Sequence, residues 1–378
     1  MEDKNKKNPF KFEGEGSEFF GIWIVNILLS VITLGIYSAW AKVRTNQYFY
    51  GNTKLDNDGF EYHAKPMQIL KGRIVAAVCL VAWSISNQFF PIVSSVLILA
   101  FLVILPWLAW SNARFDAAMT SYRNVHFSFA GTLKEAYIAL FGRGLVVFAL
   151  FMFGTMSIHF GIVPLAAVLL LSVPFAFVWV TVGISNYFAN GYRYGKRQFS
   201  AEYTLGDYMK IYLKAMLFGA VVMIAIGAVV AIVAGSTIFT SGFDFGNANI
   251  FGSIIVIYIG LFFGGVVVNA YKAAQIRNYT FAKLSVKDAD NQNDEFKFES
   301  TLDTWSYVGL IVTNFLLQLV TLGIARPWVM VRTSRYLADN TYVIGDLSNL
   351  VVEGEEQDMK SAISDEISEA FDVNIGIG

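Results

Sequence analysis

The residues that could bind a charged group recur at helical spacing. Trp40, Arg44, Tyr48 and Asn52 lie four positions apart, so on a helix they share one face. Trp and Tyr favour the headgroup level of a membrane, and Arg extends its side chain to reach lipid phosphates. The pattern therefore indicates an interfacial anchor. The alternatives are a cluster in which several copies bind an anionic lipid head or a small anion, and a contact between repeated units.

This pattern belongs to a longer stretch that the chain repeats. TLGIYSAWAKVRTNQYFYGNT at 33–53 returns as TLGIARPWVMVRTSRYLADNT at 321–341, with 11 of 21 positions identical. Weaker copies follow the third, fifth and seventh apolar runs of the chain. The further copies consist of Trp110 and Arg114; Trp179 and Tyr187; Tyr271, Gln275 and Tyr279; and Trp328, Arg332, Tyr336 and Asn340.

Two asparagines occupy matching positions in the outer copies. Asn26 and Asn314 each lie seven residues before a TLGI sequence, within an apolar run. A lone amide in lipid is costly and normally finds a partner. We expect a hydrogen bond between helices, for instance across this matched pair, and the alternative is a position that lines a pore or a substrate path.

A second repeated element precedes the apolar runs. It alternates aromatic with other residues, as in FKFEGEG and FKFESTL, which is typical of a short strand. Its five copies begin at Phe10, Phe60, Phe127, Phe199 and Phe296. Thr132 and Glu135 fit a helix capping box. We therefore expect a module of a short strand, a capped helix into the membrane and an amphipathic extension out of it.

The composition predicts a membrane protein. The 378 residues are 55% hydrophobic and 15% charged, whereas a soluble domain has about 25% charged residues. Most of the eight uncharged apolar runs approach or reach the roughly 17–25 residues that a helix needs to cross a bilayer. The runs cover 19–37, 74–90, 92–110, 145–160, 162–182, 215–239, 250–270 and 305–325. We expect a single polytopic membrane domain over 1–352.

The basic residues predict which loops face the cytoplasm. All 28 Lys and Arg lie outside the apolar runs and outside the short connections after Phe90, Phe160 and Phe239, so the long loops are expected to be cytoplasmic. The first and last runs have basic residues at both ends, but neither has a central Gly or Pro. We expect all eight runs to cross. In the alternative, the first and last runs dip in and return, or lie along the interface.

The two long copies, with FKFEGEGSEFF ahead of the first, resemble the YjgN family of bacterial inner-membrane proteins, a domain of unknown function. The resemblance extends from Phe10 to about Gly345. It implies a polytopic protein of the bacterial inner (cytoplasmic) membrane, and it implies no particular activity. The acidic tail lies outside this resemblance.

Catalytic, metal and cofactor motifs are not found in the sequence. His63, His126 and His159 are scattered without an H-E-x-x-H pattern, and Cys79 is the only cysteine. We expect no enzyme activity, no metal and no cofactor. The net charge of −1 predicts no nucleic-acid partner. No Asp or Glu falls inside an apolar run, which disfavours a cation-coupled transporter. The oligomeric state is not predicted.

The expected fold class is an all-α membrane protein: a polytopic helical bundle of pseudo-repeated modules with short cytoplasmic strands and amphipathic helices. Residues 353–378 are expected to form an acidic amphipathic tail, which docks on the basic loops or a protein partner, or stays loosely ordered. The expected function is a membrane scaffold, or a protein that interacts with lipid or a partner. The alternative is a channel or transporter with a path at the repeat interface.

Overall fold

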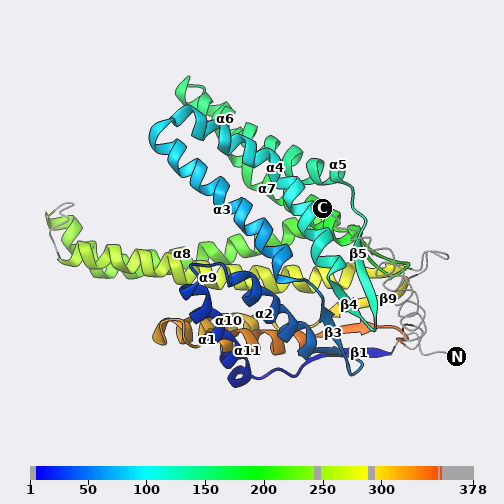
Figure 1. Cartoon of the computed structure of the whole chain (residues 1–378). Helices are drawn as coiled ribbons and strands as arrows, with labels where there is room; N and C mark the ends of the chain where they lie inside the picture. The colour runs from blue at the N-terminus through cyan, green and yellow to red at the C-terminus, as the bar shows by residue number, and fades with distance from the viewer. Residues whose placement is uncertain (1–5, 242–247, 288–293, 348–349, 351–378) are drawn as a thin grey trace.

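The computed structural model describes residues 6–241, 248–287, 294–347 and 350, so the predicted acidic tail lies outside the described residues. Within these residues, ten strands form one closed antiparallel barrel (Figure 1). Each strand pairs with its neighbours in sequence. The strands are β1 (Lys7–Phe12), β2 (Thr53–Leu55), β3 (Asp58–Tyr62), β4 (Thr120–Tyr122), β5 (Val125–Phe129), β6 (Tyr192–Tyr194), β7 (Arg197–Ala201), β8 (Leu284–Lys287), β9 (Asp294–Ser300) and β10 (Thr341–Ile344).

The barrel is closed by pairing of the first strand with the last. Lys7 of β1 is opposite Ile344 of β10, in antiparallel register. The buried amide of Asn8 reinforces this seam, because its Nδ2 donates to the carbonyl oxygens of Val343 at 3.2 Å and Gly345 at 2.9 Å. The two ends of the described chain therefore lie side by side.

The prediction of an all-α bundle with short strands is wrong, because the strands close into this barrel. The aromatic alternation marked only the strand that begins each module. The strands that end the first three modules, β2, β4 and β6, have three residues each, too few to show a period of two. The closing pair also joins residues more than 300 positions apart, which no local pattern reveals.

Helices connect the two strands of each module. They are α1 (Gly16–Ile32), α2 (Ser38–Asn52), α3 (Pro66–Phe89), α4 (Pro91–Ala118), α5 (Leu133–Ala136), the π-helix η1 (Tyr137–Gly142), α6 (Arg143–His159), α7 (Val163–Gly191), α8 (Leu205–Ser241), α9 (Ala248–Lys283), α10 (Thr304–Val320) and α11 (Arg326–Asp339). The described chain thus has five modules of strand, helices, strand. Two-residue turns join the first three pairs of modules, with positive φ at Asp56 and Asn57, at Arg123 and Asn124, and at Gly195.

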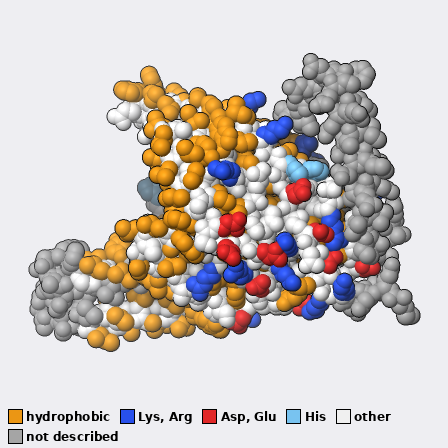
Figure 2. All heavy atoms as spheres, turned by 60° about the horizontal axis from the view of Figure 1, so that its bottom comes forward, with side chains coloured by type: hydrophobic (Ala, Val, Ile, Leu, Met, Phe, Trp, Pro, Cys, Tyr) orange, Lys and Arg blue, Asp and Glu red, His pale blue; other side chains and the backbone are white. Residues whose placement is uncertain are grey.

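Six helical segments of the described chain are long and apolar enough to cross a membrane, by length and composition. They form three tall hairpins, α3–α4, α5–α7 and α8–α9. Most of their side chains are exposed, which suits contact with lipid. In Figure 2, hydrophobic side chains cover the helical part, and the Lys, Arg, Asp and Glu side chains gather toward the barrel.

The first and last apolar runs form short hairpins instead. The helices α1 and α10 have 17 residues each, and the helices that follow them return to the barrel, where β2 pairs with β1 and β10 pairs with β9. Both ends of each hairpin are therefore on the barrel side of any membrane. This geometry fits the alternative, in which these two runs dip in and return or lie along the interface, better than the expectation that all eight runs cross, and the crossing itself stays a prediction.

The repeated TLGI sequence makes the tight turn at the tip of each short hairpin. Leu34 and Gly35 have φ of 50° and 91°, and the matching Leu322 and Gly323 have 51° and 86°. The threonine organises the turn: the Thr33 hydroxyl donates to the Leu29 carbonyl at 2.7 Å and accepts from the Tyr37 N–H at 2.9 Å. Thr321 makes the same pair of bonds. The turn lies at the C-terminal end of each apolar run, which is why the run needed no central Gly or Pro.

A hydrophobic core fills the barrel interior. Its buried residues include Leu55, Tyr122, Val125, Val286 and Val343. Partly buried phenylalanines from the predicted strands pack against them; these are Phe10, Phe60, Phe127, Phe199 and Phe298. A residual cavity of about 280 Å³ remains among these side chains. The alternating aromatics of the sequence therefore serve to fill the barrel.

Candidate binding site at the two short hairpins

Closure of the barrel places the first and last hairpins beside each other. The ring of Phe20 on α1 lies 5.0 Å from the ring of Trp328 on α11. The Arg335 guanidinium of α11 donates through Nη2 to the Gly14 carbonyl oxygen at 2.9 Å. The two outer copies of the repeated stretch are thus neighbours in space, although they lie at opposite ends of the sequence.

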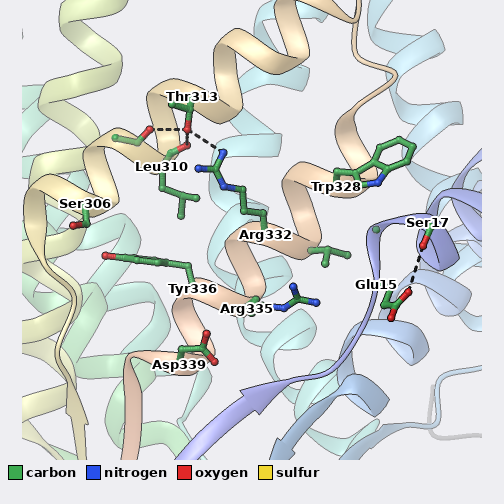
Figure 3. A pocket seen from close by; sticks show the side chains of 13 residues that line it. Glu15, Ser17, Ser306, Leu310, Thr313, Trp328, Arg332, Arg335, Tyr336 and Asp339 are labelled. Carbon is green, nitrogen blue, oxygen red and sulfur yellow. Dashed lines mark hydrogen bonds between the residues drawn. The ribbon is translucent and has the colours of Figure 1, made fainter.

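A pocket of about 820 Å³ opens between α10, α11 and the start of α1. Figure 3 shows it from close by. Three of the four residues predicted for the last copy line this pocket: Trp328, Arg332 and Tyr336. Its other polar lining residues are Glu15, Ser17, Ser306, Thr313, Arg335 and Asp339. The fourth predicted residue, Asn340, instead donates to the Tyr336 carbonyl at 2.8 Å, at the end of α11.

The charges around this pocket balance. Arg332 is exposed and donates through Nη1 to the Thr313 hydroxyl at 3.1 Å and to Asn314 Oδ1 at 3.2 Å. These bonds hold its guanidinium while leaving donors for a ligand. Together with Arg335 it faces a lining that also contains Glu15 and Asp339. Such a pocket fits a group that carries a phosphate and a cation together.

The first copy of the repeated Trp–Arg–Tyr–Asn pattern has a structural role. Arg44 donates through Nη1 to the Tyr37 hydroxyl at 3.1 Å, and Trp40 stacks on the Tyr37 ring at 6.0 Å. Tyr48 is buried, and its hydroxyl accepts from the Glu15 N–H at 2.8 Å. Burial raises the pKa of Tyr48 to about 12, and the nearby Glu18 adds to the shift. Asn52 donates to the carbonyl of Tyr48 at 2.9 Å.

The tyrosine of this repeated pattern has the same role in four modules. Its hydroxyl bonds to the backbone of the residue just before the first helix of the same module. The pairs are Tyr48 with Glu15 at 2.8 Å, Tyr187 with Thr132 at 3.2 Å, Tyr279 with Thr204 at 3.0 Å and Tyr336 with Asp303 at 3.3 Å. In these four modules the tyrosine therefore connects the helix that returns to the barrel with the start of the first helix of the same module.

The copies at Trp110 and Trp179 make their contacts in other modules. Trp110 donates through Nε1 to the Gly131 carbonyl at 2.8 Å, and the Arg114 guanidinium lies 4.8 Å from the Trp110 ring centre. Trp179 is covered by Arg143 at 4.7 Å. The structure thus brings the first and last copies together and leaves the copies at Trp110 and Trp179 apart from them.

The matched asparagines are not hydrogen-bonded to each other. Asn314 Nδ2 donates to the Thr333 hydroxyl at 2.9 Å, and its Oδ1 accepts from Arg332. Asn26 is 5% exposed, and its Nδ2 and Oδ1 have no partner among the described residues. Equivalent positions therefore have different surroundings.

Sequence reasoning missed several residues that line the pocket. Arg335 is three residues from Arg332, so helical spacing of i+3 could have placed it on the same side. Ser306 comes from α10 of the same hairpin, whereas Glu15 comes from the first module, and closure of the barrel brings it here. The His63 and His126 rings, scattered in sequence, lie 5.0 Å apart. Within the described residues, no group of three or more His, Cys, Asp or Glu side chains could hold a metal ion.

These features define a class of protein: a multi-pass membrane protein whose helical hairpins project from a closed β-barrel. The chain belongs to the family described as "Bacterial protein of unknown function (DUF898)", whose model matches residues 7–370. It is 28% identical over 377 residues to the inner membrane protein YjgN of Salmonella typhimurium, covering 95% of this chain and 94% of that relative.

The inner membrane protein YjgN of Escherichia coli is 26% identical over 387 residues, with 94% of each chain covered. No solved structure matches the chain. The resemblance to the YjgN family is confirmed. The names of these relatives and the six apolar segments place the chain in the bacterial inner membrane as a multi-pass protein.

Proposed function

We propose that this protein is a non-enzymatic, lipid-interacting scaffold whose barrel lies on the cytoplasmic side of the inner membrane. The observation that carries the proposal is the pair of short hairpins. A helix of 17 residues spans about 25 Å at 1.5 Å per residue, which is less than the roughly 30 Å of the hydrocarbon core. The hairpins are therefore too short to cross, and they return to the barrel side after their tips enter the adjacent leaflet.

The hairpin tips have the surface that such insertion needs. Leu34 is 95% exposed and Leu322 is 91% exposed, and Ile32 and Val320 beside them are also exposed. In water each of these side chains would leave apolar area unburied, whereas lipid removes that cost. The last hairpin itself forms the pocket, between α10, α11 and the start of α1. The balanced charges of this pocket suit a zwitterionic phospholipid head.

The cytoplasmic placement of the barrel rests on the basic residues. The long segments that carry the Lys and Arg side chains are the ones that form the strands and the barrel-side ends of the helices. The positive-inside rule assigns that side to the cytoplasm. The alternative function, a channel or transporter, stays a prediction, and the cavity inside the barrel is lined by apolar side chains.

A fluorophore in the pocket tests the proposal. On a Cys79→Ser background, Ser306→Cys is labelled and the protein is reconstituted with phosphatidylcholine that carries a nitroxide on its headgroup. We expect strong quenching at position 306. The matched control is Lys196→Cys in the turn between β6 and β7, where we expect little quenching. Equal quenching at both positions, or none at 306, would contradict a headgroup in this pocket.

A further inference from the structure

A second cavity, of about 520 Å³, lies where the first and last modules meet. Four elements contribute to it: α1, α2, the first turns of α3 and the start of α11. Its polar lining includes Asn26, Lys42, Thr45, Arg73 and Arg326. Most of the lining comes from α1 and α2, and closure of the barrel adds Arg326 and Met330 from the last module.

The charged residues that line this cavity are all basic. Lys42, Arg73 and Arg326 line it, and no Asp or Glu is among its lining residues in the described chain. Arg73 donates to the Ser38 hydroxyl, whereas Lys42 and Arg326 have no ion pair with the described residues. Three cations around one space repel one another, and an anion placed among them would remove that repulsion.

A buried amide without a partner lies in the wall of the same cavity. Asn26 lines it, is 5% exposed, and has neither its donor nor its acceptor satisfied among the described residues. Leaving such a group buried and unpaired costs about 1–3 kcal/mol. Native interiors rarely keep unpaired polar groups of this kind. A ligand bound in the cavity would supply both missing partners.

In the last copy of the repeat, the matching asparagine is hydrogen-bonded within the protein. There, Asn314 bonds to Thr333 and Arg332 on the returning helix. The equivalents in the first copy are Thr45, which lines the cavity, and Arg44, which bonds to Tyr37 instead. The first copy has therefore lost the internal partners of its asparagine at the place where three cations gather.

The cavity lies at the level where the apolar surface begins. Arg73 directly precedes the apolar run 74–90, and Arg326 directly follows the exposed hairpin tip at Leu322 and Ile324. Lys42 is one turn into α2 after the other tip. Basic side chains at this position meet lipid phosphates in a membrane.

We propose that Asn26, Lys42, Arg73 and Arg326 form a binding site for the phosphate group of an anionic ligand, with an anionic phospholipid head as its source. The three cations neutralise the phosphate, and Asn26 Nδ2 donates to one of its oxygens. Asn26 Oδ1 accepts from a hydroxyl group of the head. The choice of a lipid source rests on the proposed function, because it requires the hairpins to lie in the membrane.

Thermal unfolding in a neutral detergent tests the site. The unfolding temperature is measured with phosphatidylglycerol, with phosphatidylcholine and with inorganic phosphate at matched concentrations. We expect phosphatidylglycerol to raise it most, because a ligand that binds only the folded state stabilises it. The combined variant K42Q/R73Q/R326Q should bind phosphatidylglycerol at least roughly tenfold more weakly. An equal shift with inorganic phosphate alone would support the site and assign a free anion as its source.

The Asn26→Leu variant separates a ligand site from a purely structural position. It removes an amide that has no protein partner, so without lipid we expect an unchanged or higher unfolding temperature, together with loss of most of the lipid-induced rise. The matched control is Asn314→Leu, which should lower the unfolding temperature and keep the lipid-induced rise. A second control, K11Q/K134Q/K196Q, removes three cations elsewhere and should keep the rise.

A full lipid-induced rise in both K42Q/R73Q/R326Q and Asn26→Leu would overturn the site. Its failure can be told apart from failure of the proposed function. Quenching at position 306 that persists while the phosphatidylglycerol effect is absent refutes this site alone. Loss of quenching at position 306 refutes the proposed function, whichever way the unfolding experiment comes out.

Discussion

The hydroxyl of Tyr48 bonds to the backbone of Glu15, and so joins the end of α2 to the start of α1. The same tyrosine position makes this tie in three further modules. A side chain that looked like a membrane anchor in the sequence therefore fixes the angle at which each hairpin leaves the barrel.

Removing this tie should destabilise the protein. Tyr48→Phe keeps the ring contact with Phe19 but leaves the Glu15 N–H and the Glu18 carboxylate without the hydroxyl. We expect a loss of about 1–2 kcal/mol in the free energy of unfolding, measured by denaturation in detergent. Tyr258→Phe is the control, because Tyr258 is 71% exposed; an equal loss in both variants would contradict the tie.

The turn at the hairpin tip should depend on its glycine. Gly35 has φ of 91° and open space around its Cα, so Gly35→Ala adds backbone strain without a steric clash. We expect a loss of about 1 kcal/mol or more in stability. Gly21 also has open space but lies inside α1 at an ordinary φ. Gly21→Ala should therefore be neutral or stabilising, and a loss there as large as at Gly35 would argue against the conformational explanation.

Tyr122 should make stability fall at high pH. Burial raises its pKa to about 12, above the usual value of about 10. The folded state therefore holds the proton more tightly, so the stabilisation is complete below pH 10 and is lost as the pH rises from 10 to 12. Unfolding of the native protein and Tyr122→Phe, compared between pH 8 and 12, measures this. Parallel curves for the two proteins would show that Tyr122 contributes nothing.

Labelling of single cysteines should show that the short hairpins do not cross. On the Cys79→Ser background, Lys6→Cys and Asn57→Cys lie at the barrel before and after the first hairpin. A membrane-impermeant maleimide should label both only in opened cells. Phe90→Cys, between α3 and α4, should be labelled in intact cells. Opposite behaviour of positions 6 and 57 would mean that α1 crosses.

The sequence revealed the elements better than their assembly. Apolar length marked the six segments long enough to cross a membrane together with the two shorter hairpins. The aromatic alternation at Phe10 and Phe127 identified strands whose side chains do face the barrel core. Closure depended on pairs such as Lys7 with Ile344, which are far apart in the chain. Three-residue strands such as β2 carry no periodic signal, so the barrel could not be predicted from local pattern.

The candidate sites were predictable only in part. Trp328, Arg332 and Tyr336 were found because they repeat at a spacing of four, and they do line a pocket. Lys42, Arg73 and Arg326 share no spacing, since they come from three different helices. Asn26 was singled out, but its identity to Asn314 in sequence concealed the difference in their partners. Repeats predict equal positions, and the surroundings of each copy decide its chemistry.

The cyclic order of the five modules has a consequence for the bilayer around them. The three tall hairpins follow one another, and the two short ones complete the circuit (Figure 1). In the proposed membrane placement, the protein displaces more lipid from the leaflet next to the barrel than from the opposite leaflet. A body with this taper imposes unequal lateral pressure on the two leaflets, so its energy depends on the local curvature of the membrane.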